Sequence, residues 1–388
     1  MNLDHNSGAR VRPEVREAVA DLLGRDLANP SSAHAAGRRA RDAIESARDE
    51  VAALVNARPA EVVFTSGGTE ANNLAVLGSL GAGDHVVSTA IEHASVLEAI
   101  ERARECGARS TLVRPASDGA IAAADVAAAL DGATRVVSVG WANGEIGNVQ
   151  PIADIAGSVR ARAAELGSRP LVHSDAVQAA GVVEVDFVRS GADLLTLSGH
   201  KLGALTGVGA LVVRSGTALR PIMLGGPHER ERRAGTENVV GIASFGVAAR
   251  LASAEREERA RRARRLRDRL WAGLAAAAAP VVRLGREDGL PTTLAIAFPG
   301  ARGDALVLAL DLAGIAASTG AACAAGAAEP SHVVRALGCS PEVAAGALRL
   351  SLGRDVGEDD VERAVAIVAA AVARARSERR ARGLSDAA

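Results

Sequence analysis

Short runs of apolar residues alternate with longer alanine-rich stretches between about residues 51 and 245. Each run is three to five residues long and almost continuously apolar, which is typical of strands buried on both faces of a parallel sheet. The stretches between the runs are long enough for helices that would cover both faces. The pattern therefore predicts an α/β fold with a large, mostly parallel mixed sheet, whose strands lie at residues 62–64, 85–88, 135–139, 171–173, 194–197 and 209–213.

The rest of the chain predicts a second, smaller α+β unit. A long charged helix from Arg250 to about Ala279 would connect the two units. We expect a large domain of residues 15–255 and a small domain of residues 1–14 and 256–388. The small domain is predicted to hold strands at 281–284, 293–298 and 348–352, helices at 303–314 and 341–347, and an amphipathic last helix from Glu358 to about Arg382.

The composition is that of a soluble globular protein. The 388 residues are 48% hydrophobic and 23% charged. A formal net charge of −1 argues against an electrostatic nucleic-acid surface. We expect no secretory leader, because the chain does not start with a basic segment followed by an apolar one. We also expect no membrane span, because no apolar stretch reaches about 20 residues.

The cysteines separate into two kinds. Cys106, Cys323 and Cys339 are too few and too scattered for a disulfide framework or a zinc site, which favours a reducing cytoplasm and predicts no metal site. Cys106 and Cys339 stand beside glycines near expected helix ends, and we interpret them as packing residues. Cys323 lies in a run of small residues, 317–332, which predicts a surface loop with an accessible thiol. The alternative is a buried cysteine that fills a turn.

A lysine and an aspartate follow two neighbouring predicted strands. Lys201 comes just after the run at 194–197, and Asp175 ends the strand before it. This arrangement is what an enzyme needs to hold pyridoxal phosphate: the amine forms a Schiff base with the aldehyde, and the carboxylate keeps the pyridine nitrogen protonated. Either residue alone would more often be a solvated surface charge, so the prediction depends on the pair and its surroundings.

Three further positions suit the same chemistry, each with a plainer alternative. Gly67-Gly68-Thr69 leads from a strand into a helix, where free N–H groups bind an anion, although an ordinary turn would look alike. His93 follows a strand and could stack on a flat ring and move protons, or it could cap the next helix. Arg349 is the one charge on an apolar strand and could bind a substrate carboxylate, or form a structural ion pair.

Taken together, the motifs resemble the NifS/IscS-like cysteine desulfurases, which are class V aminotransferase-family, fold-type I pyridoxal-phosphate enzymes. The resemblance runs from Leu3-Asp4 to Gly353, in the family's order. Its most specific matches are Asn29–His34, Thr65–Asn73, His173–Gln178, Ser198–Lys201, Arg233–Asn238 and Cys323–Ser331.

The resemblance implies a cofactor site and a reaction. Lys201 would carry the cofactor, Asp175 would meet the pyridine nitrogen and Gln178 the ring hydroxyl. His93 would stack on the ring and shuttle protons. The phosphate would be held by Gly68, Thr69, Ser198 and His200 of one chain and Thr236 of a second copy, which implies a homodimer.

The substrate would be L-cysteine, with its carboxylate on Arg349. Cys323 would attack the substrate sulfur, become a persulfide and release alanine. The sulfur would pass to an acceptor protein, such as an iron–sulfur scaffold or a thiolation enzyme. The sequence does not distinguish iron–sulfur cluster assembly from tRNA thiolation or cofactor synthesis.

Departures from the family pattern lie around the expected substrate pocket. Ser7-Gly8-Ala9 replaces an Ala-Thr-Thr run, and Asn143-Gly144 replaces a pair of asparagines, so Asn143 is the candidate for the missing amide contact. The alternatives are a selenocysteine lyase or another class V enzyme, or a catalytically weak sulfur-transfer scaffold.

Overall fold

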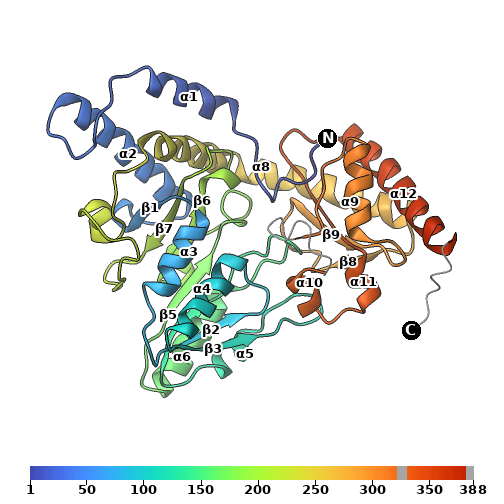
Figure 1. The fold of residues 1–388 in the computed structure, drawn as a ribbon, viewed down its shortest axis with the longest axis horizontal. Helices are drawn as coiled ribbons and strands as arrows, with labels where there is room; N and C mark the ends of the chain where they lie inside the picture. The colour runs from blue at the N-terminus through green and yellow to red at the C-terminus, as the bar shows by residue number, and fades with distance from the viewer. Residues whose placement is uncertain (321–329, 382–388) are drawn as a thin grey trace.

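The computed structural model describes residues 1–320 and 330–381, which build two sheets joined by one long helix (Figure 1). The large sheet has seven strands in the order β1-β7-β6-β5-β4-β2-β3. Its middle and far strands are parallel, and only β7 runs against both of its neighbours. The strands are β1 (Val62–Thr65), β2 (His85–Thr89), β3 (Arg109–Val113), β4 (Thr134–Ser138), β5 (Leu171–Asp175), β6 (Leu194–Ser198) and β7 (Gly209–Val213).

The predicted α/β class and mostly parallel sheet are confirmed, with one strand missed. β3 lies at the edge of the sheet and buries only Val113 among its five residues. An edge strand with solvent on its faces needs no continuous apolar run, so the pattern that marks the other strands is absent there.

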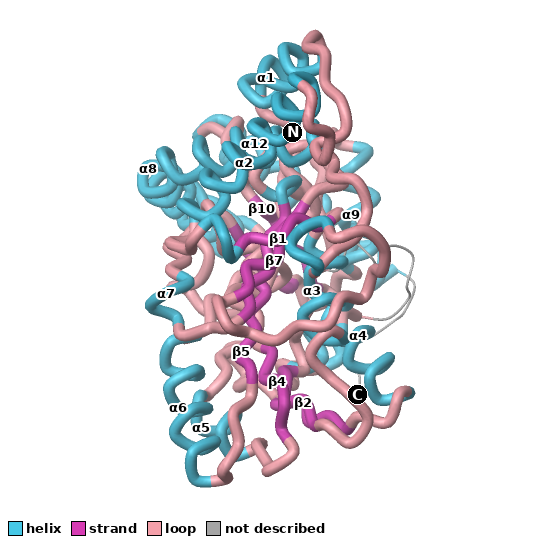
Figure 2. Tube along the Cα trace, turned by 90° about the vertical axis from the view of Figure 1, so that its left-hand side faces the viewer, coloured by secondary structure: helices cyan, strands magenta, loops and turns pink. Residues whose placement is uncertain are grey.

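Helices cover both faces of this sheet, as Figure 2 shows. On one face, α3 (Gly68–Leu77) and α4 (Ala94–Glu105) pack on Val63, Val86 and Val136. On the other, α2 (Ala35–Leu54), α6 (Ile152–Glu165) and α8 (Val239–Ala277) pack on the alternate residues, such as Phe64 and Val137. Shorter helices α1 (Pro13–Leu23), α5 (Ala123–Ala128) and α7 (Phe187–Ser190) complete these layers.

The small sheet is antiparallel, in the order β10-β9-β8. Residues 2–4 lie beside it, because Asn2 and Asp4 form bridges to Ala316 and Ser351. The N-terminus and the C-terminal third therefore pack together, as expected, while the proposed domain boundaries stay a prediction. The elements are β8 (Val282–Leu284), β9 (Thr293–Ala297), α9 (Gly303–Leu312), α10 (His332–Ala336), α11 (Pro341–Ala345), β10 (Ala347–Ser351) and α12 (Glu358–Ala381).

Helix α8 runs from the large sheet to the small one (Figure 1). It begins at Val239, earlier than the predicted start at Arg250, because its first turns are apolar and buried against the large sheet rather than charged. Its C-terminal half contributes Leu266, Leu270 and Leu274 to the core of the small sheet. Within residues 1–320 and 330–381, no helix combines the length and the apolar character needed to span a bilayer.

Helices α2 and α8 approach each other closely at Gly246. A Cβ at this position would lie 2.6 Å from Cα of Ala47 in the backbone of α2. Glycine is therefore required by the spacing of the two helices and not by its conformational freedom.

A pair of glycine-to-alanine variants tests this packing. Gly246→Ala should lower the free energy of unfolding by about 1–3 kcal/mol, because the helices must separate. Gly157→Ala, in α6, should raise it by about 0.5–1 kcal/mol, because nothing lies within 4 Å of a Cβ there. Urea unfolding measures both, and a stabilising Gly246→Ala would contradict the close approach.

Candidate active site

The carboxyl ends of β5 and β6 place the predicted aspartate and lysine beside each other. Asp175 ends β5 and pairs in register with Thr196 of β6, while Lys201 lies in the turn that follows β6. The Lys201 ammonium donates to the main-chain oxygens of Asn6, at 2.5 Å, and Ser7, at 3.0 Å. Gln178 Nε2 donates to the same Asn6 oxygen at 3.1 Å, so the N-terminal segment joins the lysine and the glutamine.

Asp175 is a buried carboxylate, 9% exposed, whose hydrogen-bond donors are neutral. Its Oδ1 accepts from the Val177 N–H at 2.9 Å, and its Oδ2 accepts from Asn72 Nδ2 at 2.7 Å. A buried carboxylate is stabilised by a positive charge close to it, so the site is suited to a cationic group at Asp175.

The N-terminus of α3 forms a cradle next to these strand ends. A Cβ at Gly68 would lie 2.8 Å from Cγ2 of Val177 and 3.5 Å from Cβ of Ser198, so only a glycine fits here without displacing its neighbours. The first N–H groups of a helix have no partner within it and attract anions. Thr69 is exposed in this first turn.

Ser198 and His200 add two neutral polar groups to the cradle. The Ser198 hydroxyl lies 2.8 Å from His200 Nδ1. Burial, together with the charge of Lys201, lowers the pKa of His200 to about 4. The imidazole is therefore neutral at physiological pH and offers hydrogen bonds rather than a positive charge.

His93 is exposed and caps α4, and it also belongs to a polar chain that reaches Asp175. Its Nδ1 lies 3.1 Å from the Ser95 N–H and 2.7 Å from the Ser95 hydroxyl. Asn72 Nδ2 donates to that hydroxyl at 2.8 Å and to Asp175. The capping alternative is thus correct, and it does not conflict with a role in the site. Asn72 was not predicted; its only sequence signal is an amide among the apolar, buried positions of α3.

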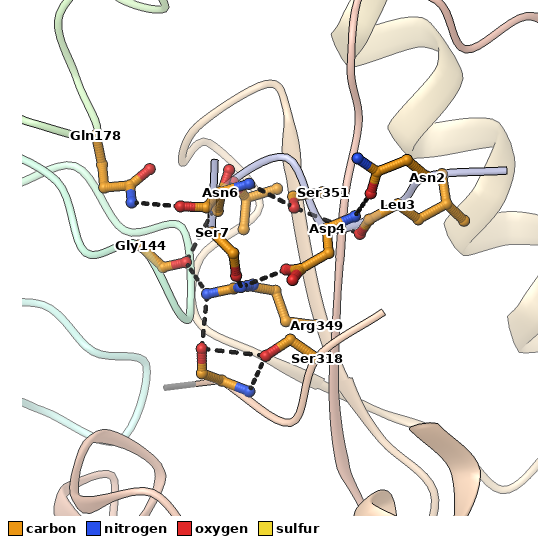
Figure 3. A network of polar contacts seen from close by, with 12 residues as sticks. Asn2, Leu3, Asp4, Asn6, Ser7, Gly144, Gln178, Ser318, Arg349 and Ser351 are labelled. Carbon is orange, nitrogen blue, oxygen red and sulfur yellow. Dashed lines mark hydrogen bonds and ion pairs between the residues drawn. The ribbon is translucent and has the colours of Figure 1, made fainter. Parts of the chain in front are cut away.

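Arg349 lies at the centre of the polar network drawn in Figure 3. The guanidinium is 4% exposed and forms an ion pair with Asp4, 2.6 Å away. It also donates to the Ser7 hydroxyl and to the main-chain oxygens of Gly144 and Gly320, at 2.9, 3.1 and 2.7 Å. Its Nε is buried and has no partner among the described residues. The structural ion pair considered from the sequence is present, with one donor left for a further acceptor.

The departure at Asn143-Gly144 has a structural account. The amide of Asn143 donates to the Ile91 oxygen and accepts from the N–H groups of Glu145 and Ile146, so it builds its own loop. A Cβ at Gly144 would lie 2.8 Å from Gln178 Nε2. A larger residue at 144 would displace Gln178, and the cofactor contact expected of Asn143 stays a prediction.

One predicted residue, Thr236, is not assembled with the rest. Thr236 is exposed, near an ion pair of 2.9 Å between Arg233 and Glu70 of α3. Cys323 lies outside the described residues. The interpretation of Cys106 as a packing residue is wrong, because it is exposed at the C-terminal end of α4. Cys339 is half-buried, and burial raises the pKa of its thiol.

A cavity of about 730 Å³ reaches the site from one side. It touches Lys201 and Gln178 and extends past Arg12 to Arg259 and Arg354. Asp175, His93 and Gly68 do not line it, so the cavity lies beside the residues described above rather than among them.

Comparison with known proteins identifies the family. The model of the aminotransferase class-V family matches residues 1–364. An IscS-like cysteine desulfurase of Mycobacterium tuberculosis is 42% identical, over 96% of each chain.

The chain belongs to the cysteine desulfurases of the class-V aminotransferase family.

Solved structures of the family agree. A NifS-like protein superposes with a TM-score of 0.89 at 31% identity, covering 96% of this chain and 99% of the other. SspA in complex with cysteine superposes with a TM-score of 0.77 at 30% identity, covering 90% and 98%. The fold-type I architecture predicted from the sequence is confirmed.

The residues of this family member fit pyridoxal phosphate. An amine, a buried carboxylate and a glycine-lined helix N-terminus lie at the ends of neighbouring strands. They match the aldehyde, the pyridine nitrogen and the phosphate of that cofactor, respectively.

Glu92, next to His93, is a buried acid in the same region. Its Oε1 accepts from the Thr89 hydroxyl at 2.6 Å and from the Gly140 N–H at 3.0 Å. Burial raises the pKa of its carboxyl from 4.5 to about 7. The folded protein therefore holds this proton more tightly than the unfolded chain does.

The raised pKa of Glu92 predicts a pH-dependent stability. As pH rises from 4.5 to 7, the carboxyl ionises in the unfolded chain first, so the free energy of unfolding falls. Glu92→Gln keeps the acceptor oxygen without the charge. We expect it to be more stable than the unsubstituted protein by about 2–3 kcal/mol above pH 7, with the difference vanishing below pH 4.5. Urea unfolding across this range tests it, and a difference independent of pH would contradict it.

Proposed function

We propose that this chain is a homodimeric pyridoxal-phosphate enzyme that converts L-cysteine to L-alanine and takes the sulfur as a persulfide on Cys323. The observation that carries the proposal is the buried Asp175 carboxylate at the strand end next to Lys201. The family and its cysteine desulfurase relatives support the reaction, and SspA in complex with cysteine supports the substrate.

The cofactor would be held by residues from four segments. Lys201 would bind its aldehyde, Asp175 its pyridine nitrogen and Gln178 its ring hydroxyl. When bound, pyridoxal phosphate condenses with an amine and withdraws electrons from the adjacent carbon. The phosphate would be held by Gly68, Thr69, Ser198 and His200, with Thr236 of a second copy.

Arg349 would bind the carboxylate of the substrate. Its unpartnered Nε provides one buried donor, and the Gly320 and Gly144 oxygens hold the guanidinium in place. A planar guanidinium suits a carboxylate. The ion pair with Asp4 compensates the positive charge of the arginine in the absence of substrate.

Cys323 would take the sulfur atom. Its thiolate attacks the sulfur of L-cysteine, so an S–S bond forms while the substrate Cβ–S bond breaks. The electron pair of the broken bond stays with Cβ, which takes up a proton, giving L-alanine and an enzyme persulfide. A free thiol has a pKa of about 8.5, so a base must remove its proton, and His93 is the candidate.

A second copy and an acceptor complete the proposal. Ile222, Met223 and Leu224, which precede Thr236 by 12 to 14 residues, are 41%, 42% and 81% exposed. An apolar stretch of this kind suits a covered interface, which supports a homodimer in which Thr236 reaches the other copy. The persulfide would pass to an acceptor protein with a sulfur-accepting group, such as an iron–sulfur scaffold or a thiolation enzyme, in the cytoplasm.

Removing the thiol tests the reaction. Cys323→Ala should lower alanine and sulfide formation from L-cysteine by about 100-fold or more, while the absorbance of the bound cofactor is kept. Cys106→Ala, with an exposed thiol on α4, is the matched control and should retain the original rate.

Other outcomes would contradict the proposal. Undiminished turnover of L-cysteine by Cys323→Ala would favour a selenocysteine lyase or another class V activity, and turnover of L-selenocysteine alone would do the same. A protein that stays colourless after incubation with pyridoxal phosphate would favour the sulfur-transfer scaffold.

A further inference from the structure

Four side chains form a continuous chain of hydrogen bonds between the two residues predicted to meet the cofactor ring. Asp175 Oδ2 lies 2.7 Å from Asn72 Nδ2, which lies 2.8 Å from Ser95 Oγ, which lies 2.7 Å from His93 Nδ1. Three of the four residues are buried, with Asn72 1%, Ser95 7% and Asp175 9% exposed. Strand β5 and helices α3 and α4 each contribute to the chain.

The direction of the first bond fixes the orientation of Asn72. An ionised carboxylate only accepts hydrogen bonds, so the amide must turn its NH₂ group toward Asp175. The second N–H of the same group then points to the Ser95 hydroxyl. The amide oxygen is left buried without a partner among the described residues. Burying the amide oxygen without a hydrogen-bond donor is unfavourable. This orientation is nevertheless the one that lets the NH₂ group donate to both Asp175 and Ser95.

The direction of the next hydrogen bonds determines which ring nitrogen of His93 carries the hydrogen. Because Ser95 Oγ accepts from Asn72, its own hydrogen is available for His93 Nδ1. The Ser95 main-chain N–H also donates to Nδ1, at 3.1 Å. A nitrogen that accepts two hydrogen bonds carries no hydrogen itself, so the ring hydrogen of the neutral imidazole lies on Nε2.

We propose that Asn72 is a positioning residue that sets the tautomer of His93 through Ser95, so that the neutral imidazole presents Nε2–H to the site. The consequence for the reaction rests on the proposed function, in which His93 exchanges protons beside the ring. In this tautomer the neutral imidazole donates a hydrogen bond at Nε2 and takes up a proton only at Nδ1, where the proton replaces the hydrogen bonds from Ser95.

The test reads the tautomer directly by ¹⁵N NMR of histidine-labelled holoenzyme, and again after the cofactor is removed. The chain has eight histidines, and His93→Gln assigns the signals of His93. At a pH where His93 is neutral, Nε2 should show the shift of a protonated ring nitrogen and Nδ1 that of an unprotonated one. The opposite pattern in the unsubstituted protein would overturn the proposal.

Two variants separate positioning from folding. Asn72→Leu and Ser95→Ala should each reduce the ratio of the Nε2–H to the Nδ1–H tautomer by about five-fold or more. Ser95→Ala keeps the bond between Asn72 and Asp175, so it disturbs only the histidine end. Asn73→Ala is the control on the same helix, because its amide donates to the Thr69 oxygen and not to this chain; it should leave the ratio unchanged.

The result is independent of whether the proposed reaction is correct. An unchanged ratio in both folded variants would overturn the role of Asn72, even in an active desulfurase. A shifted ratio in a protein that does not turn over L-cysteine would support the role of Asn72 and contradict the proposed function instead.

Discussion

The guanidinium of Arg349 is buried in the middle of the molecule, and a buried charge is tolerated only when acceptors surround it. Those acceptors come from parts of the chain that are far apart in sequence: Asp4 and Ser7 at the N-terminus, Gly144 in a loop of the large sheet, and Gly320. Satisfying the arginine therefore fixes the N-terminal segment against both sheets. The same segment places the Asn6 and Ser7 oxygens at the Lys201 ammonium, so the position of the lysine depends on the charge of the arginine.

The site holds opposite charges on neighbouring strand ends through neutral groups. Two hydrogen bonds of the Lys201 ammonium run to main-chain oxygens, and the donors to Asp175 are a main-chain N–H and an amide. These contacts orient the amine and the carboxylate toward the same region, which suits a ligand with an electrophilic aldehyde at one end and a basic ring nitrogen at the other.

Much of this arrangement could be predicted from the sequence, because buried parallel strands are continuous apolar runs and ligand-binding residues lie at their carboxyl ends. The strand ends bearing Asp175 and Lys201 were found this way. β3 was not, since only Val113 of that edge strand is buried. The predicted start of helix α8 was too late in the sequence, because its first turns are apolar and lack the charged pattern of the rest of the helix. The roles of Asn72 and Ser95 could not be predicted, because they depend on contacts between two helices and a strand. No local sequence pattern indicates such contacts. The exposure of Cys106 likewise depends on how α4 packs.

The central claim is that the ε-amine of Lys201 holds the aldehyde of pyridoxal phosphate. Reduction of the purified holoenzyme with borohydride, followed by peptide mapping by mass spectrometry, tests it most directly. The account predicts one stoichiometric pyridoxyl label, on the peptide that contains Lys201. An unlabelled Lys201, with the label absent or on another amine, would contradict the account.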